Sequence, residues 1–216
     1  MIDDPEAFIR ENTALQPVPH APEIRLYVAD EITPIWRMTE QALGAMGIAP
    51  PFWAFAWAGG QALARYVLDH RETVAGKTVL DFASGSGLVA IAAMKAGAAQ
   101  VLACDVDPIC RAAIAVNAQA NGVSVEAAIA DLLDRPPPEV DVILAGDICY
   151  EKTLTGRVLR WLEAARAAGA QVLIGDPGRT YFPKSGLVQL AQYEVKTTRE
   201  LEDYEIKRTG VWTFPG

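Results

Sequence analysis

The stretch Val79-Leu80-Asp81-Phe82-Ala83-Ser84-Gly85-Ser86-Gly87-Leu88 decides the fold of this chain. Residues 79–82 form a short apolar run, typical of a buried strand, and residues 83–87 carry only small side chains. The apolar residues from 88 to 96 then suit a buried helix. A turn of this kind lets backbone N–H groups approach a ligand closely, beside a helix N-terminus. The stretch therefore predicts a ligand-binding loop.

Length, composition and charge limit the classes of protein. The 216 residues fit one domain, or one domain with a small appendage, and 51% of them are hydrophobic, which is enough for a sizeable core. Because the formal net charge is −8 and no basic block is present, we expect no nucleic-acid partner. The apolar runs are too short for a membrane span, and the acidic N-terminus lacks signal-peptide features. We expect a cytoplasmic monomer.

The cysteines and histidines do not form a metal-binding or disulfide pattern. Cys104, Cys110 and Cys149 are odd in number, and none stands in a Cys-x-x-Cys motif. The histidines, His20 and His70, have no partner at helical spacing. We therefore expect reduced cysteines, buried or without a role, and no metal.

The N-terminal segment, residues 1–50, is predicted to be an appendage of helices and one short strand. Asp4-Pro5 predicts a helix over 5–13, because aspartate caps helices and proline suits the first turn. The prolines within 17–22 predict an extended connection, and alternation over 24–28 predicts a strand. A second helix is expected to begin at Thr33-Pro34.

Alternating strands and helices follow, within a domain that we place at residues 51–216. The expected elements are strands over 78–82, 100–104, 124–129, 140–145 and 171–175, with helices over 87–96, 108–120 and 153–168. Two more strands, at 193–200 and 204–214, are expected to form a closing hairpin with a turn near Glu202-Asp203. The pattern predicts an α/β fold: a Rossmann-like, seven-stranded, mostly parallel sheet with an antiparallel C-terminal hairpin and helices on both faces.

Several segments carry a resemblance to a known family. They are Pro51–Ala54, Trp57–Leu63, Gly76–Asp81, Asp105–Pro108, Gly146–Tyr150 and Leu173–Arg179. With them the chain resembles a class I S-adenosylmethionine-dependent methyltransferase, and it is similar to the lysine methyltransferases that include the enzyme acting on the β subunit of electron transfer flavoprotein. The resemblance covers about residues 50–216. It implies S-adenosylmethionine as methyl donor, S-adenosylhomocysteine as product, and that β subunit as protein substrate.

Carboxylates at the ends of three predicted strands suit this cofactor. Asp81 can attract the ammonium of its methionine moiety, Asp105 can accept both ribose hydroxyls, and Asp131 can accept from the adenine amino group. Val106 and Leu132 can sandwich the adenine. The predicted cofactor-binding residues are Trp57, Gly59, Asp81, Ala83, Ser84, Gly85, Gly87, Asp105, Val106, Asp131 and Leu132.

A dinucleotide is the competing ligand for the loop. The turn lacks the Gly-x-Gly-x-x-Gly spacing of dinucleotide sites, and it departs from the common methyltransferase pattern by carrying Ala83 at its first glycine position. Its acidic lead residue, Asp81, suits a ligand that carries an ammonium and a sulfonium, and would repel a pyrophosphate. We therefore favour S-adenosylmethionine over NAD.

The methyl acceptor is expected beside Asp147 and Tyr150, which follow the fourth strand of the series and which we predict to be catalytic. Enzymes that methylate planar amides or bases commonly carry Asn/Asp-Pro-Pro-Tyr/Phe at this place, whereas this chain has Asp147-Ile148-Cys149-Tyr150. The missing prolines count against a nucleobase or glutamine acceptor. A carboxylate can hold and orient a lysine amine. The alternative for Asp147 is a cap for helix 153–168. Phe55, Asp176 and Arg179 are the predicted substrate-binding residues.

Residues 50–57 hold an unusual density of aromatic side chains before Gly59-Gly60 and a predicted helix over 61–70. Such density is typical of a core, which we favour, and also of a pocket wall. The first functional hypothesis is a protein-lysine N-methyltransferase. The alternatives are a methyltransferase for another protein, such as a ribosomal one, or for a small amine; a cofactor-binding protein without transferase activity; and, least favoured, an oxidoreductase.

Overall fold

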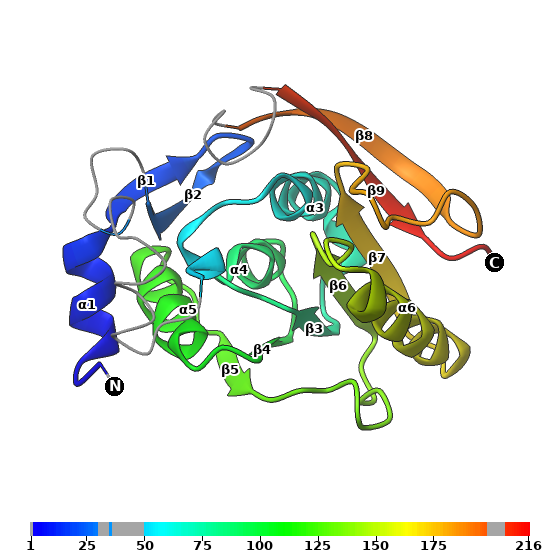
Figure 1. Ribbon diagram of the computed structural model, residues 1–216, viewed down its shortest axis with the longest axis horizontal. Helices are drawn as coiled ribbons and strands as arrows, with labels where there is room; N and C mark the ends of the chain where they lie inside the picture. Colours follow the sequence, from blue (N-terminus) through cyan, green and yellow to red (C-terminus); the bar gives the residue numbers. More distant parts are fainter. Residues whose placement is uncertain (1, 30–34, 36–49, 198–205) are drawn as a thin grey trace.

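A seven-stranded sheet forms the centre of the computed structural model, which describes residues 2–29, 35, 50–197 and 206–216 (Figure 1). The strand order is β5-β4-β3-β6-β7-β9-β8. The strands are β3 (Thr78–Phe82), β4 (Gln100–Asp105), β5 (Glu126–Ile129), β6 (Val142–Gly146), β7 (Gln171–Asp176), β8 (Val188–Lys196) and β9 (Ile206–Thr213). The first five are parallel, and β9 runs antiparallel between β7 and β8. The predicted fold class is confirmed.

Helices cover both faces of the sheet, because both faces of its central strands are apolar. The helices α3 (Ala58–Asp69), α4 (Leu88–Lys95) and α5 (Ile109–Ala120) share one hydrophobic core with one face. The helix α6 (Lys152–Ala167) packs on the other face, where the ring of Trp161 lies 5.1 Å from that of Phe82. Short 3₁₀ turns at η2 (Phe52–Ala54) and η3 (Arg71–Thr73) flank α3.

The start of α3 touches the sheet backbone to backbone. A Cβ atom at Gly59 would lie 2.2 Å from the carbonyl oxygen of Gly175 in β7, and one at Gly146 in β6 would lie 3.0 Å from the Cα of Gly60. Side chains at these positions would push α3 away from the strands. The glycines therefore place the N-terminus of α3 directly against the carboxyl ends of β6 and β7.

Residues 2–29 pack on the helical layer, and none of these described residues joins the central sheet (Figure 1). The helix α1 (Pro5–Asn12) begins where the Asp4 carboxylate accepts the Ala7 N–H at 3.0 Å, as predicted. The strands β1 (Ala14–Val18) and β2 (Ala21–Val28) then form an antiparallel hairpin, which we call the N-terminal hairpin.

Two segments differ most from the expectations, and the ends of several other elements, such as α3 and β5, shift by a few residues. Residues 14–18 form the strand β1, although the prolines predicted an extended connection; Pro17 is tolerated because β1 is an edge strand. The strand β8 begins at Val188 rather than at residue 193, because a register shift between Gln189 and Ala191 interrupts the alternation of apolar and polar residues near its start. The helix predicted from Thr33 and the turn near Glu202 lie outside the described residues. No helix in the described ranges is both long and apolar enough to span a bilayer.

Candidate active site

A cavity of about 520 Å³ opens at the carboxyl ends of β3, β4, β5 and β6. Its walls are the loop 83–87, the residues that follow β4, β5 and β6, and the aromatic segment 50–57. This is where ligands bind in open α/β sheets. The parallel strands therefore bring residues that are distant in the sequence to one cavity.

The loop 83–87 has an unusual backbone. Ala83, Gly85 and Gly87 all have left-handed φ angles, of 56°, 52° and 82°. Ala83 adopts this conformation although alanine strains there by about 1–2 kcal/mol, so the loop keeps a glycine-like backbone without its first glycine. Gly87 is also the N-cap residue of α4.

Asp81 holds this loop from below. Its Oδ2 accepts the Ser84 Oγ–H at 2.6 Å and the Ala90 N–H of α4 at 3.0 Å. Its side chain is 1% exposed, and this burial raises its pKa to about 7. A carboxyl whose pKa is raised by burial repels phosphate less than a fully ionised one does. Through these two hydrogen bonds Asp81 supports the loop.

Asp105, the last residue of β4, is oriented by the backbone around it. Its Oδ2 accepts the Gly85 N–H at 2.8 Å, and its Oδ1 accepts the N–H groups of Val106 at 2.7 Å and Asp107 at 3.0 Å. Asp131 lies on the rim, where its Oδ1 accepts the Leu133 N–H at 2.9 Å. Both carboxylates line the cavity with fixed directions, as hydroxyl and amine recognition requires.

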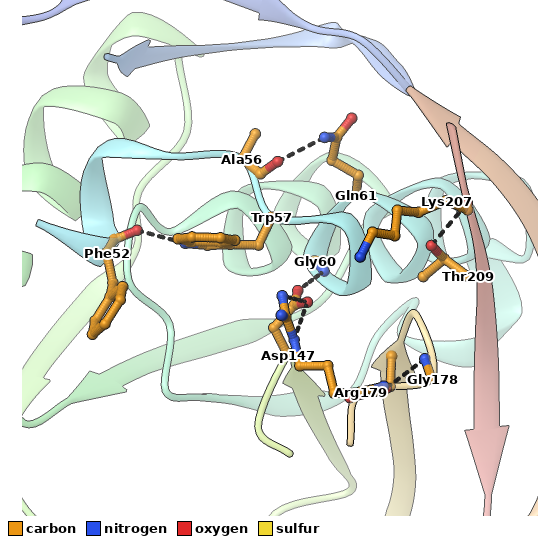
Figure 2. A network of polar contacts seen from close by, with 11 residues as sticks. Phe52, Ala56, Trp57, Gly60, Gln61, Asp147, Gly178, Arg179, Lys207 and Thr209 are labelled. Atoms are coloured by element: carbon orange, nitrogen blue, oxygen red, sulfur yellow. Dashed lines mark hydrogen bonds and ion pairs between the residues drawn. The ribbon is translucent and has the colours of Figure 1, made fainter. Parts of the chain in front are cut away.

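Asp147 joins three parts of the site (Figure 2). Its Oδ2 accepts the Gly60 N–H at 2.7 Å, in the first turn of α3, and its Oδ1 accepts Arg179 Nη2–H at 2.7 Å. Its side chain is 11% exposed, and burial raises its pKa, against the opposite effect of Arg179. The cap of α6 is Glu151, so the alternative role of Asp147 as that cap is wrong. Asp147 also has a left-handed φ of 57°, a strain typical of functional positions.

Aromatic rings form the wall opposite the loop. The ring of Trp57 lies 5.7 Å from that of Phe55 and 6.1 Å from that of Phe52, and the Trp57 indole N–H donates to the Phe52 carbonyl at 2.9 Å. The Arg179 guanidinium lies 5.6 Å from the Trp57 ring centre, within cation–π range. Tyr150, 55% exposed, packs at 6.1 Å from Phe52 at the mouth. Asp147 and Arg179 thus meet beside an aromatic wall.

Comparisons with known proteins place the chain in a family. The profile of the ribosomal protein L11 methyltransferase (PrmA) family matches residues 61–150. The electron transfer flavoprotein beta subunit lysine methyltransferase of Rattus norvegicus is 36% identical over 97% of this chain and 84% of its own length. The Homo sapiens protein of the same name is 34% identical over 98% and 83%. The chain belongs to the electron transfer flavoprotein β-subunit lysine methyltransferase family.

Solved structures agree with this fold. The ribosomal protein L11 methylase of Lactobacillus delbrueckii subsp. bulgaricus superposes with a TM-score of 0.52, at 20% identity, over 75% of this chain and 81% of that one. At this identity the likeness concerns the fold alone.

In this family member, most of the predicted site residues line one cavity. Those that do are Phe55, Trp57, Asp81, Ala83, Ser84, Gly85, Asp105, Val106, Asp131, Asp147, Tyr150 and Arg179. Those outside the lining are Gly59, Gly87, Leu132 and Asp176. The aromatic segment divides: Trp53 is buried in the core and also reaches the cavity, while the less buried Phe52, Phe55 and Trp57 line the cavity. The core interpretation that we favoured therefore holds for only part of it.

The four residues outside the lining lie next to the cavity walls and do not face the cavity. Gly59 permits the close approach of α3, and Gly87 is the N-cap residue of α4. Leu132 packs in the core of the α6 face, and its neighbour Leu133 lines the cavity instead. Asp176 is 1% exposed; its Oδ1 accepts the N–H groups of Gly178 and Arg179, each at 2.7 Å, and burial raises its pKa to about 6. Asp176 shapes the loop that carries Arg179.

Sequence reasoning missed other members of the lining. They include Pro50, Phe52, Trp53, Gly60, Ser86, Asp107, Cys110, Leu133 and Ile148. Phe52, Gly60 and Leu133 lie within a few residues of predicted ones. The sequence therefore indicated the right segments, but not which side chain in each segment faces the cavity. All three cysteines are buried and free. The part of the chain that the structure describes contains no cluster of metal ligands.

Proposed function

We propose that this protein is an S-adenosylmethionine-dependent protein-lysine N-methyltransferase that acts on the β subunit of electron transfer flavoprotein. The supporting observation is that Asp105, Asp131 and Asp147 follow three parallel strands and face one cavity beside a left-handed loop. The chain also belongs to the family whose curated members carry that name. The proposal for each residue below rests on this arrangement.

The cavity fits S-adenosylmethionine in size and charge. Its volume lies within the range of about 300–1,000 Å³ that small-molecule sites occupy. Among the described residues, its lining contains five carboxylates and one guanidinium: Asp81, Asp105, Asp107, Asp131, Asp147 and Arg179. This excess of acidic groups suits a ligand with an ammonium and a sulfonium. Bound there, S-adenosylmethionine would supply an electrophilic methyl group.

Each wall has a part in holding this cofactor. Asp105 would accept the ribose hydroxyls, since its oxygens are already directed by three backbone N–H groups. Asp131 would accept from the adenine amino group, with Val106 and Leu133 on either side of the ring. The loop around Gly85 would hold the methionine moiety.

Asp147 and Tyr150 would hold the acceptor lysine. A lysine amine has an ordinary pKa of about 10.4, so it must lose a proton before it attacks a methyl group. The walls formed by Phe55 and Trp57 exclude water, which lowers the pKa of an amine that enters. An amine that approaches Asp147 competes with Arg179 for the same carboxylate oxygen. Positioning and desolvation would then provide most of the rate enhancement.

The test is methyl transfer from labelled S-adenosylmethionine into a cell lysate, with the modified residues found by mass spectrometry. We expect label on lysines of the flavoprotein β subunit with the wild type, and loss of it with Asp147→Ala. Label on another residue type would reject the reaction, and equal labelling by the variant would reject the role of Asp147.

A ribosomal protein is the second candidate acceptor. The match of residues 61–150 to the ribosomal protein L11 methyltransferase profile points to it, but the relatives that align with nearly the whole chain carry the name of the flavoprotein subunit, so we do not favour it. The same lysate experiment separates the two, because the labelled protein is identified directly. A cytoplasmic location, a monomeric state and the lack of a nucleic-acid partner stay predictions from the sequence.

A further inference from the structure

Two buried carboxamides connect the N-terminal hairpin to the walls of the cavity. Asn117 of α5 and Gln61 of α3 are 0% and 2% exposed. Each accepts a backbone N–H from the hairpin or its turn and donates its own N–H to a backbone carbonyl of a cavity wall. Buried polar groups of this kind are costly to leave unpaired.

Asn117 makes the connection to the cofactor loop. Its Oδ1 accepts the Tyr27 N–H of β2 at 2.7 Å, and its Nδ2 donates to the Ser86 carbonyl at 2.8 Å. Backbone N–H groups only donate and carbonyls only accept, so the two partners fix the orientation of the amide. Ser86 belongs to the loop 83–87 and lines the cavity.

Gln61 makes the parallel connection to the aromatic segment. Its Oε1 accepts the His20 N–H at 3.1 Å, and its Nε2 donates to the Ala56 carbonyl at 2.7 Å, beside Trp57 (Figure 2). A direct bond from the Ala29 N–H to the Ala54 carbonyl, at 2.7 Å, adds a third link. The hairpin is thus linked to both walls between which the cofactor would lie, to the loop 83–87 through the Asn117 side chain and to the aromatic segment through Gln61 and the Ala29 N–H.

We propose that Asn117 is a positioning residue of the cofactor site, and that the N-terminal hairpin holds the loop 83–87 in its binding conformation through it. If Ser86 moves, the Asn117 amide N–H loses the Ser86 carbonyl as its acceptor inside an apolar core, which is costly. Movement of the loop is therefore coupled to movement of α5 and the hairpin. The inference rests on the proposed function, because S-adenosylmethionine is taken as the ligand of the loop.

Asn121, the C-cap residue of α5, provides a matched control. It accepts the Arg25 N–H at 3.0 Å and donates to the Arg25 carbonyl at 2.6 Å, so it also fastens the hairpin. Its Nδ2 also donates to the Asn117 carbonyl at 2.8 Å, so this bond stays within α5 and its cap. Loss of Asn121 should loosen the hairpin without releasing the loop directly.

The experiment measures the Kd of S-adenosylhomocysteine by calorimetry for the wild type, Asn117→Ala and Asn121→Ala. We expect Asn117→Ala to weaken binding about tenfold and to raise the KM for the cofactor more than it lowers kcat. Asn121→Ala should stay within about twofold of the wild type, although both variants lower Tm. Equal Kd values for Asn117→Ala and the wild type, or equal weakening by both variants, would overturn the inference. A wild type that binds no S-adenosylhomocysteine would instead overturn the proposed function.

A measurement on the wild type covers the case in which Asn117→Ala does not fold. Coupling is reciprocal, so saturating S-adenosylhomocysteine should slow hydrogen exchange of the Tyr27 amide by about tenfold. The Arg25 amide, bonded to Asn121, should change little. Unchanged exchange at Tyr27, or equal slowing at both amides, would overturn the inference.

Discussion

Replacing Gly59, which carries no side chain of its own, by alanine should disable the site by displacing the start of α3. The added methyl carbon would lie 2.2 Å from the Gly175 carbonyl oxygen, 2.6 Å from Asp147 Oδ2 and 2.8 Å from Asp147 Cγ. Optimal carbon contacts lie at about 3.5–4.0 Å, so the start of α3 must move away by at least about 1 Å. Gly175 cannot yield, because it pairs within the sheet between β6 and β9.

The consequences follow from what the start of α3 holds. Overpacking of this kind costs about 1–3 kcal/mol. The same shift carries Gly60 away from Asp147 and breaks the 2.7 Å hydrogen bond from the Gly60 N–H to Asp147 Oδ2. A misplacement of a catalytic group by about 1 Å can lower the rate about 100-fold. Gly60→Ala is the control: its methyl would lie 3.7 Å from the nearest atom, Leu88 Cδ2, an ordinary contact.

Thermal unfolding and steady-state methyl transfer test this reasoning together. We expect Gly59→Ala to lower Tm and to lower kcat about 100-fold. Gly60→Ala should hold Tm at or above the wild-type value, since alanine favours helix over glycine by up to about 1 kcal/mol, and should keep most of the activity. Wild-type Tm and kcat in Gly59→Ala, or equal losses in the two variants, would refute the account of the glycine contact.

Three further predictions concern charged groups. The folded-state pKa of Asp81, about 7, exceeds its ordinary value of 3.8, so the protonated carboxyl stabilises the fold and this stabilisation is lost as pH rises through 7. Urea titrations should show that the free energy of unfolding falls by about 1.4 kcal/mol between about pH 6 and about pH 8. Asp81→Asn should abolish this pH dependence. Arg179→Gln, which leaves Asp147 unpaired, should destabilise the fold by about 3 kcal/mol, whereas Arg157→Gln at an exposed ion pair should cost under about 1 kcal/mol; equal costs would contradict the difference in burial. Asp105→Asn should weaken S-adenosylhomocysteine binding about tenfold or more by calorimetry, and an unchanged Kd would remove Asp105 from the cofactor site.

The fold could be predicted because its signals are local. Each strand of the parallel sheet is a short apolar run, and a helix-forming stretch follows most of them, so hydrophobic patterning was sufficient. The strand β1 was missed because Pro17 is a strong local signal against a strand, and only its edge position makes it acceptable. Near the start of β8, a register shift between Gln189 and Ala191 breaks the alternation of apolar and polar residues, so the pattern indicated only the later part of the strand.

The partners within the site could not be predicted, because they are set by distant parts of the chain. Asp147 was found from its position after a strand. Its bond to Gly60 spans 87 residues, and its pair with Arg179 spans 32. Spacing in the sequence gives no access to such contacts. Likewise, Asp81 was expected to select the ligand by charge, but its burial and raised pKa depend on the packing of α4 and the loop around it.

The most direct test of the central claim uses purified components. The protein is incubated with S-adenosylmethionine and the purified β subunit of electron transfer flavoprotein, and the product peptides are mapped by mass spectrometry. The account predicts one or more methyl groups on lysine Nζ atoms of that subunit, transferred by the wild type and lost with Asp147→Ala. No added methyl group, or methyl groups confined to residues other than lysine, would contradict it.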